Sequence, residues 1–411
     1  MNSAAEFLKR HSQSPEQVDA EQQILLFCRD MERGLQRDGQ TIPMIPTYLC
    51  NVDRSQIKGG KRILIDAGGT NFRSALGSFE GGKILIERQQ KRAMPASGGE
   101  TLSKSEFYDS IAQSIAPLCD EGGDVGFCFS YPVDMESNLD GKVKSFSKEV
   151  KAPQVIGTYV GAETLAALKK YDGRQRKIAI LNDTVATLLG GMAISQKDYS
   201  TYLGYIYGTG TNVCCIVDTE KITKAKNLPR GKMLINMECG GYDKFPMGDF
   251  DKKAAAKTDA PDSQLYEKMT SGKYLSEIMF EALCTAAEEG HVSRKPAHFD
   301  LKDVSALLQG QTTLGLSAED VGFASEICRL LIRRAAKLGA IANTAAAVFT
   351  AKGDKPVAIV AEGTTFNKLV GYRACFESYL AEYFSRRGLC YEVVQGEDLN
   401  LVGTLMATMA L

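Results

Sequence analysis

Residues 63–76 read ILIDAGGTNFRSAL and residues 203–217 read LGYIYGTGTNVCCIV, so one short phrase occurs twice in the chain. In each copy an apolar run leads into a glycine turn and a second apolar run follows, which is typical of strand, turn and strand. Glycines let backbone N–H groups approach an anion closely, because no Cβ stands in the way. We therefore expect two related lobes that hold one polyphosphate between them.

The composition of the whole chain limits the classes of partner. The 411 residues are 44% hydrophobic and 24% charged, with a net charge of -1, which predicts no basic field for nucleic acid. The apolar runs are too short to span a bilayer, so we expect no membrane partner. The first ten residues lack the apolar core of a signal peptide, and no two of the eleven cysteines form a CxxC pair. This pattern predicts a cytoplasmic protein with reduced thiols.

Periodicity along the chain predicts strands mixed with helices, which favours an α/β sheet protein of two or three domains. Short apolar runs indicate strands, and apolar residues at helical spacing indicate helices. The predicted strands are 61–65, 72–79, 83–90, 125–129, 178–181, 202–206, 213–217, 233–237 and 357–361. The predicted helices are 16–37, 104–118, 184–194, a largely helical stretch at 264–348, then 368–387 and 399–411.

Two acidic residues lie where predicted strands end. Asp66 comes directly before the first glycine turn, where a carboxylate would repel phosphates unless a cation intervened; Mg²⁺ held through water fits that need. Asp183 comes after a short apolar strand and begins a helix, at the edge where α/β sheets bind ligands. It can serve as the general base for an alcohol that attacks a phosphoryl group. The alternatives are a turn cap for Asp66 and a helix N-cap for Asp183.

A further set of polar side chains is spread over the middle of the chain. Each one alone is interpreted best as a surface residue. Together they supply the mixture of donors and acceptors that a polyhydroxylated ligand needs. The set comprises Ser130, Ser147, Lys148, Asn182, Asn212, Asn236, Glu238 and Glu267.

In this order and spacing the motifs resemble the hexokinase family of sugar kinases, within the actin-like ATPase superfamily, over most of the chain. The segments 66–73 (DAGGTNFR) and 208–212 (GTGTN) are similar to the two phosphate motifs of the family. The remaining matches are 129–132 (FSYP), 147–148 (SK), 182–185 (NDTV), 236–238 (NME), 266–275 (YEKMTSGKYL) and the adenosine segment 362–365 (EGTT).

The resemblance implies two actin-like ATPase (ribonuclease H-like) lobes with a central cleft. The small lobe would be 60–182 plus 399–411, and the large lobe 1–59 plus 183–398. The implied activity is transfer of the γ-phosphoryl group of ATP to the 6-hydroxyl of glucose or a related hexose. ATP and Mg²⁺ would be the cofactors, and the length resembles one catalytic unit of a bacterial-type hexokinase, as a monomer or a homodimer.

The resemblance also implies a role for each matching residue. Asp183 would be the base, and the eight polar residues of the set above would bind the sugar. Asp66 would position Mg²⁺ through a metal-bound water, and Arg73 would support the first phosphate turn. The nucleotide contacts would be Gly68, Gly69, Thr70, Asn71, Gly208, Thr209, Gly210, Gly363 and Thr364.

The chain departs from the family pattern around the sugar. Tyr131 stands in place of Phe, Ser147 in place of Thr, and Cys239 in place of Trp. The preferred sugar therefore stays open at this point. The alternatives are a kinase of another sugar or amino sugar, and a non-catalytic sugar-sensing actin-like ATPase.

Overall fold

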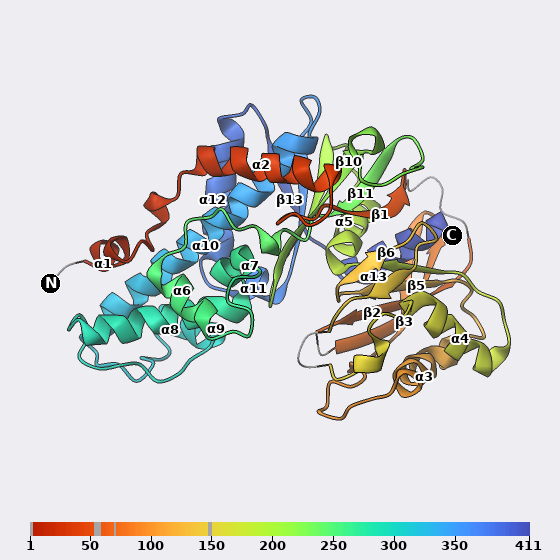
Figure 1. The fold of residues 1–411 in the computed structure, drawn as a ribbon, viewed down its shortest axis with the longest axis horizontal. Coiled ribbons are helices and arrows are strands. Elements are labelled where there is room, and N and C mark those ends of the chain that lie inside the picture. The colour runs from red at the N-terminus through yellow and green to blue at the C-terminus, as the bar shows by residue number, and fades with distance from the viewer. Residues whose placement is uncertain (1–2, 53–58, 70, 147–149) are drawn as a thin grey trace. The chain divides into compact units, whose positions relative to one another are not determined.

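The computed structural model describes residues 3–52, 59–69, 71–146 and 150–411, drawn in Figure 1. Three residues with predicted roles, Thr70, Ser147 and Lys148, lie outside the described residues. The chain forms two compact units, each assembled from three segments. The first unit comprises Met1–Met44, Tyr199–Val213 and Met237–Val393. The second unit comprises Ile45–Asp198, Cys214–Asn236 and Val394–Leu411.

The second unit is built on a five-stranded sheet with the order β4-β3-β2-β5-β8. Strands β2, β3 and β4 form an antiparallel meander, whereas β5 and β8 run parallel to β2. The parallel strands are short and almost wholly buried, as expected for strands covered on both faces. The strands are β2 (Arg62–Gly68), β3 (Asn71–Glu80), β4 (Lys83–Ala93), β5 (Val125–Phe129) and β8 (Ile178–Leu181).

Helices cover both faces of this sheet. On one face, α3 (Lys104–Ile115) and α4 (Val160–Asp172) share a core with alternate residues of β2 and β5. On the other face, Leu401 and Leu405 of α13 (Leu399–Ala407) pack on Leu64 and Ala75. This alternation is the period-two pattern of a strand buried on both sides.

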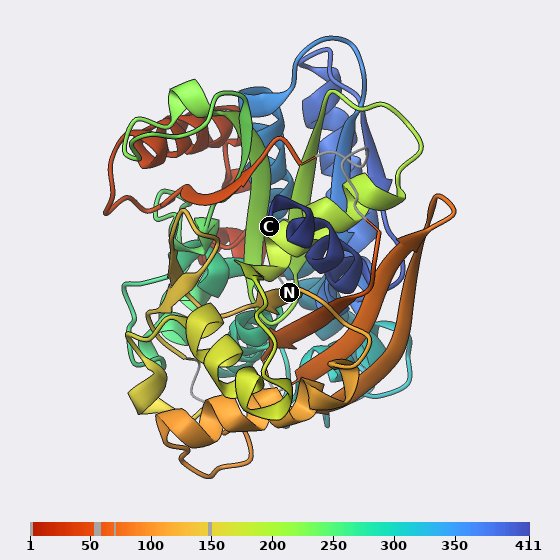
Figure 2. The same cartoon turned by 90° about the vertical axis from the view of Figure 1, so that its right-hand side faces the viewer.

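Helix α13 also crosses α5 (Asp183–Ile194) at very short range (Figures 1 and 2). A Cβ on Gly403 would lie 1.8 Å from the carbonyl oxygen of Ala186, and a Cβ on Gly190 would lie 2.3 Å from that of Leu399. Because a side chain at either position would meet backbone rather than a flexible side chain, the crossing requires glycine in both helices.

A six-stranded sheet has the order β1-β11-β10-β9-β12-β13. In the first unit β9 pairs in parallel with β12, from Thr201↔Val357 to Ile206↔Glu362. In the second unit β11 pairs antiparallel with both β10 and β1. The strands are β1 (Ile45–Cys50), β9 (Thr201–Tyr207), β10 (Thr211–Asp218), β11 (Lys232–Asn236), β12 (Val357–Glu362) and β13 (Tyr391–Val394). A two-stranded sheet pairs β6 (Val133–Met135) with β7 (Gly141–Val143).

The helices of the first unit gather around α10 (Val321–Thr350), which contacts α12, α2 and α8. Alanine and other small residues fill the buried middle of α10, so its neighbours approach closely. The other helices are α1 (Ala4–Arg10), α2 (Ala20–Gln36), α6 (Asp249–Ala256), α7 (Leu265–Thr270), α8 (Gly272–Glu288), α9 (Leu301–Leu308), α11 (Thr364–Lys368) and α12 (Tyr372–Ser385). Short 3₁₀ turns occur at Pro15–Gln17, Ala116–Leu118, Pro153–Val155, Thr219–Lys221, Cys239–Gly241 and Thr408–Ala410.

The predicted fold class is confirmed: the protein is a mixed α/β structure with two mixed sheets. Several predicted bounds were wrong. The predicted helix 368–387 begins later, as α12 (Tyr372–Ser385), and the predicted helix 16–37 is a 3₁₀ turn followed by α2. The stretch 264–348 is largely helical, as predicted, and comprises four helices. The sequence analysis missed β1, because Pro46 indicates a break; β1 is an edge strand, where proline is tolerated.

None of the boundaries between the two compact units falls at the predicted lobe boundary between 182 and 183. Helix α5 follows that boundary directly, yet it packs on α13 and belongs with the five-stranded sheet. The two predicted lobes stay a prediction.

Candidate active site

Three parallel strands of the second unit end at one edge of the five-stranded sheet, and each is followed by predicted site residues. In the register of the sheet Asp66 lies beside Cys128, and Cys128 lies beside Leu181. The glycine turn at 68–69 comes after Asp66, Ser130 comes after β5, and the pair Asn182 and Asp183 comes after β8. The carboxyl ends of parallel strands are where α/β sheets bind ligands.

The strand that carries Cys128 lies between β2, which carries Asp66, and β8, which Asp183 follows. Burial raises the pKa of the Cys128 thiol well above its ordinary value, and the charges of Asp66 and Asp183 raise it further. Both carboxylates therefore act on the same buried thiol, although 117 positions separate them in the sequence numbering. The convergence of Asp66 and Asp183 is thus a property of the folded unit.

Asp66 is held by Arg73, which faces it across the β2–β3 ladder. Arg73 donates two hydrogen bonds to the same oxygen, Oδ2 of Asp66, from Nε at 3.0 Å and from Nη2 at 2.6 Å. A third donor of Arg73, Nη1, bonds Oδ1 of Asp398 at 2.9 Å. The side chain of Asp66 is 11% exposed, so this pairing offsets the cost of placing its charge at the sheet edge.

The first glycine turn is braced from the segment after β5. The backbone N–H of Ser130 donates to the carbonyl oxygen of Ala67 at 2.9 Å, and the Tyr131 hydroxyl donates to the carbonyl oxygen of Gly69 at 2.6 Å. Gly69 has φ +57°, and a Cβ built on it meets no described atom within 4 Å. The turn therefore combines a backbone held from behind with open space in front, which suits the approach of an anion.

Asp183 is the first residue of α5, and the helix is capped by its neighbour. Oδ1 of Asn182 accepts the backbone N–H of Thr184 at 2.9 Å, which makes Asn182 the N-cap. Oδ1 of Asp183 also accepts this N–H, at 2.7 Å. The alternative of Asp183 as N-cap is therefore wrong, because that position belongs to Asn182.

The second glycine turn lies in the first unit, beside the start of α8. The backbone N–H of Gly272 donates to the carbonyl oxygen of Gly208 at 2.8 Å, and that of Lys273 donates to Thr209 at 3.3 Å. A Cβ on Gly363 would lie 2.2 Å from the carbonyl oxygen of Tyr207. The fold thus brings together the second phosphate motif, a helix N-terminus and the predicted adenosine segment.

A second polar group of the first unit is organised around Asn212. Its Oδ1 accepts the backbone N–H groups of Val213 at 2.8 Å and Cys239 at 3.3 Å. These two donors fix the orientation of the amide, so Nδ2 donates to Oε1 of Glu238 at 3.3 Å. Glu238 itself adopts a left-handed backbone conformation, with φ +51°. Non-glycine residues in this region are uncommon and cluster at functional sites.

Glu267 approaches the same group from α7. Its Oε2 accepts the backbone N–H of Thr211 at 3.3 Å, and a Cβ on Gly210 would lie 2.6 Å from this oxygen. Burial raises the pKa of Glu267 to about 7. The hydrogen bond from the Thr211 backbone lowers this pKa, and the nearby charge of Glu238 raises it. Two carboxylates, an amide and backbone donors therefore meet in one unit, a set that matches sugar hydroxyls.

We expect Glu267 to make the protein less stable as the pH rises from 5 to 8. The folded state binds the Glu267 proton up to about pH 7, whereas the unfolded chain releases it near the ordinary value of 4.5. Between these values the folded state holds more protons, so its free energy of unfolding falls as the pH rises. In Glu267→Gln this slope should become shallower, as measured by urea unfolding at pH 5, 6, 7 and 8.

Glu288→Gln is the control for this measurement, because hydrogen bonding to Lys295 lowers the pKa of the exposed Glu288 below this window. This variant should keep the slope of the unchanged protein. Parallel profiles for Glu267→Gln and the unchanged protein would contradict the assignment.

The predicted site residues divide between the two units, and within each unit they form groups. Asn236 ends β11 in the second unit and Asn71 begins β3. Sequence reasoning missed Asp398 and the role of the Tyr131 hydroxyl. In the second unit lie Asp66, Gly68, Gly69, Asn71, Arg73, Ser130, Asn182, Asp183 and Asn236; in the first lie Gly208, Thr209, Gly210, Asn212, Glu238, Glu267, Gly363 and Thr364.

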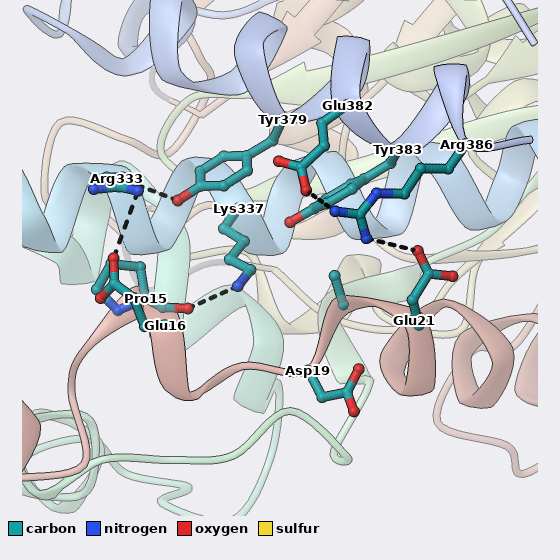
Figure 3. Close-up of a pocket in the computed structure, with 11 residues that line it drawn as sticks. Pro15, Glu16, Asp19, Glu21, Arg333, Lys337, Tyr379, Glu382, Tyr383 and Arg386 are labelled. Atoms are coloured by element: carbon teal, nitrogen blue, oxygen red, sulfur yellow. Dashed lines mark hydrogen bonds and ion pairs between the residues drawn. The ribbon is translucent and has the colours of Figure 1, made fainter.

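Two surface pockets of the structure are lined by other residues. A groove of about 290 Å³ lies in the first unit. Figure 3 shows its lining, in which Arg333 pairs with Glu16 and Arg386 pairs with Glu21 and Glu382. Both arginines are thus paired with acids of the same chain, and Lys337 donates to the carbonyl oxygen of Pro15 at 2.8 Å. The network therefore fastens the start of α2 to α10 and α12.

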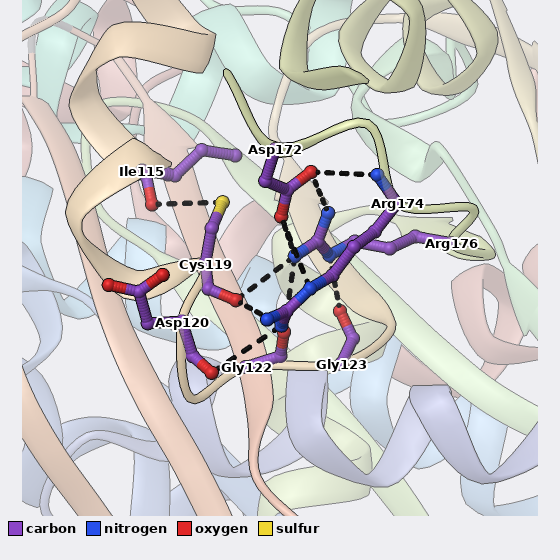
Figure 4. Close-up of polar contacts among 8 residues, drawn as sticks. All are labelled: Ile115, Cys119, Asp120, Gly122, Gly123, Asp172, Arg174 and Arg176. Atoms are coloured by element: carbon purple, nitrogen blue, oxygen red, sulfur yellow. Dashed lines mark hydrogen bonds and ion pairs between the residues drawn. The ribbon is translucent and has the colours of Figure 1, made fainter. Parts of the chain in front are cut away.

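A second pocket, of about 190 Å³, lies beside the end of α4 in the second unit. Figure 4 shows Arg176 bonded to Asp172 and to the carbonyl oxygens of Cys119, Gly122 and Gly123. Asp172 and three backbone carbonyls thus engage this guanidinium, whose side chain is 3% exposed. Its role is to hold the turn before β5 in place.

The mixed α/β fold is shared with solved hexokinase structures. A hexokinase from Schistosoma mansoni complexed with glucose superposes with a TM-score of 0.82, at 22% sequence identity, covering 99% of this chain and 98% of that chain. Hexokinase family profiles match residues 3–193 and 202–410. The chain belongs to the hexokinase family.

Curated relatives agree with this assignment. Hexokinase-5 of Oryza sativa subsp. japonica is 31% identical over 351 residues, which cover 76% of this chain and 68% of the relative. Hexokinase-1 of Saccharomyces cerevisiae is 27% identical over 402 residues, which cover 88% and 82%. Among the described residues, no helix is long and apolar enough to cross a membrane.

Proposed function

We propose that this protein transfers the γ-phosphoryl group of ATP to the 6-hydroxyl of glucose or a related hexose. The observation that carries the proposal is the convergence of Asp66, Ser130 and Asp183 at the carboxyl ends of three parallel strands. A candidate base and a candidate carboxylate for Mg²⁺ thus lie at one edge of one sheet, as phosphoryl transfer requires. Membership of the hexokinase family supports the same activity.

In the proposed reaction Asp183 accepts the proton of the attacking 6-hydroxyl, at a carboxylate oxygen beside the start of α5. Asn212, Glu238 and Glu267 accept and donate hydrogen bonds to the other hydroxyls and so orient the sugar. These contacts act by positioning, which is the main source of catalysis in phosphoryl transfer. Ser147, Lys148, Asn182 and Asn236 are proposed as further sugar ligands.

The residues present fit the nucleotide and its metal ion. The glycine turns at 68–69 and 208–210 let a phosphate approach the backbone closely. The first two N–H groups of α8 bond the carbonyl oxygens of Gly208 and Thr209 and so brace the second turn. Among the described residues, no group of three or more His, Cys, Asp and Glu could hold a metal alone. Mg²⁺ would be held by the phosphates, with Asp66 contacting it through water, and would neutralise the charge on the transferred group.

A coupled assay for ADP release, run over a sugar panel, tests this proposal. Glucose, mannose, fructose, glucosamine and a pentose should be compared, each with ATP and Mg²⁺. We expect ADP release to depend on at least one hexose, and 6-deoxyglucose, which lacks the accepting hydroxyl, to give no phosphorylated product. Sugar binding by calorimetry without ADP release would instead indicate a sensor.

A further inference from the structure

Asp398 precedes α13 at the N-cap position, but its carboxylate does not serve the helix. Within the described residues its side chain makes no capping hydrogen bond to α13. Aspartate at this position normally accepts a backbone N–H of the first turn and stabilises the helix by doing so. Asp398 also has φ +50°, a left-handed conformation that costs a non-glycine residue free energy. Neither feature is explained by α13 itself.

Both carboxylate oxygens of Asp398 are engaged on the sheet instead. Oδ1 accepts Nη1 of Arg73 at 2.9 Å, and Oδ2 accepts Nε2 of Gln89 at 2.7 Å. Arg73 lies on β3 and Gln89 on β4, so Asp398 ties the start of α13 to two neighbouring strands. The side chains of Arg73 and Asp398 are 29% and 30% exposed, so their pairing is partly shielded from water.

Arg73 transmits this constraint to Asp66. Nε and Nη2 of its guanidinium bond Oδ2 of Asp66, while Nη1 bonds Asp398. Burial lowers the pKa of Arg73, but the charges of Asp66 and Asp398 outweigh burial and raise it, so the cation is stabilised between two carboxylates. A planar guanidinium held at both ends has one orientation, and it therefore fixes the rotation of the Asp66 carboxylate.

We propose that Asp398 is a positioning residue, which holds Arg73 so that Arg73 orients the Asp66 carboxylate toward the metal–nucleotide complex. The inference rests on the proposed function, because it assigns Asp66 to Mg²⁺ and ATP. Without Asp398, Arg73 keeps its contact with Asp66 but loses the anchor that selects its orientation. The expected defect lies in the use of Mg²⁺–ATP and leaves sugar binding unchanged.

The test compares the unchanged protein with Asp398→Asn in two measurements. In steady-state kinetics we expect kcat to fall about 10- to 100-fold, the usual effect of losing an outer partner of a metal ligand, and the Mg²⁺ concentration for half-maximal activity to rise. The KM for the sugar should change less than twofold. In calorimetry the gain in affinity that Mg²⁺ gives a non-hydrolysable ATP analogue should shrink, and this readout needs no catalysis.

Asp300→Asn is the matched control, because Asp300 is an N-cap of α9 whose carboxylate does cap its helix, accepting the N–H groups of Lys302 and Asp303. This variant should keep the kinetics and the Mg²⁺ dependence of the unchanged protein. Gln89→Leu, which removes the other partner of Asp398 and leaves the carboxylate in place, should give a weaker form of the Asp398→Asn defect. Gln89→Leu also keeps the proposal testable if the Asp398→Asn protein fails to fold.

A double-mutant cycle decides whether Asp398 acts through Arg73. If it does, adding Asp398→Asn to Arg73→Lys should lower kcat much less than it does alone. Additive losses, or an Asp398→Asn protein that melts lower with unchanged kcat and Mg²⁺ dependence, would overturn the proposal. Absence of sugar phosphorylation by the unchanged protein would refute the proposed function separately, while the calorimetric comparison would still test the role of Asp398.

Discussion

Asp183→Asn should reduce phosphoryl transfer by about 10²- to 10⁴-fold, which is the usual contribution of a general base. The amide has nearly the shape of the carboxylate, and its oxygen can still accept the backbone N–H of Thr184, which lies 2.7 Å from Oδ1. The N-cap of α5 is Asn182, so the substitution leaves the cap in place. We therefore expect a protein that folds normally, binds nucleotide and sugar, and turns over very slowly.

The measurement is kcat from coupled ADP release, with calorimetric binding of sugar and nucleotide as the test of site integrity. Asp249→Asn is a matched control, because Asp249 is also the first residue of a helix and its carboxylate pairs with His11, which is not a predicted site residue. The control should keep its kcat. An Asp183→Asn protein that keeps most of its kcat would refute the base assignment and direct attention to Asp66.

Gly403→Ala should destabilise the second unit strongly. The added Cβ would lie 1.8 Å from the carbonyl oxygen of Ala186, a distance that requires the backbones of α13 and α5 to separate. Overpacking of a close-packed interior costs about 1–3 kcal/mol, and more where backbone must move. We expect a lower urea midpoint and a lower yield of folded protein.

Gly322→Ala provides the control for helix propensity. Gly322 lies in the first turn of α10, and a Cβ on it meets no described atom within 4 Å. Alanine in an open helical position stabilises by up to about 1 kcal/mol relative to glycine. The two alanine variants should therefore shift the urea midpoint in opposite directions; equal shifts would show that the helix crossing tolerates a methyl group.

The sequence predicted the wholly buried strands well. Residues 125–129 and 178–181 are short apolar runs with polar ends, and both form strands at these bounds. Strand β13 was missed because four partly buried residues carry little periodic signal. The helical stretch 264–348 was placed but not divided, since its breaks depend on local turn geometry at the ends of α8 and α9.

The candidate site was predicted unevenly for a physical reason. Asp66 lies near the end of β2, and Ser130 and Asp183 follow β5 and β8, so parallel pairing alone brings them to one edge. Asp398 gave no such signal: it reads as an ordinary N-cap, and its partner Arg73 lies 325 positions away. Only the packing of α13 on the sheet places these two side chains together.

That packing also has a consequence during synthesis of the protein. Leu401 and Leu405 cover Leu64 and Ala75, yet α13 emerges from the ribosome more than 200 residues after β8 completes the five-stranded sheet. At bacterial or eukaryotic translation speeds this interval lasts roughly 10–40 s. During it one apolar face of the nascent sheet has no native cover, which makes the incomplete chain a client for chaperones that bind exposed hydrophobic strands.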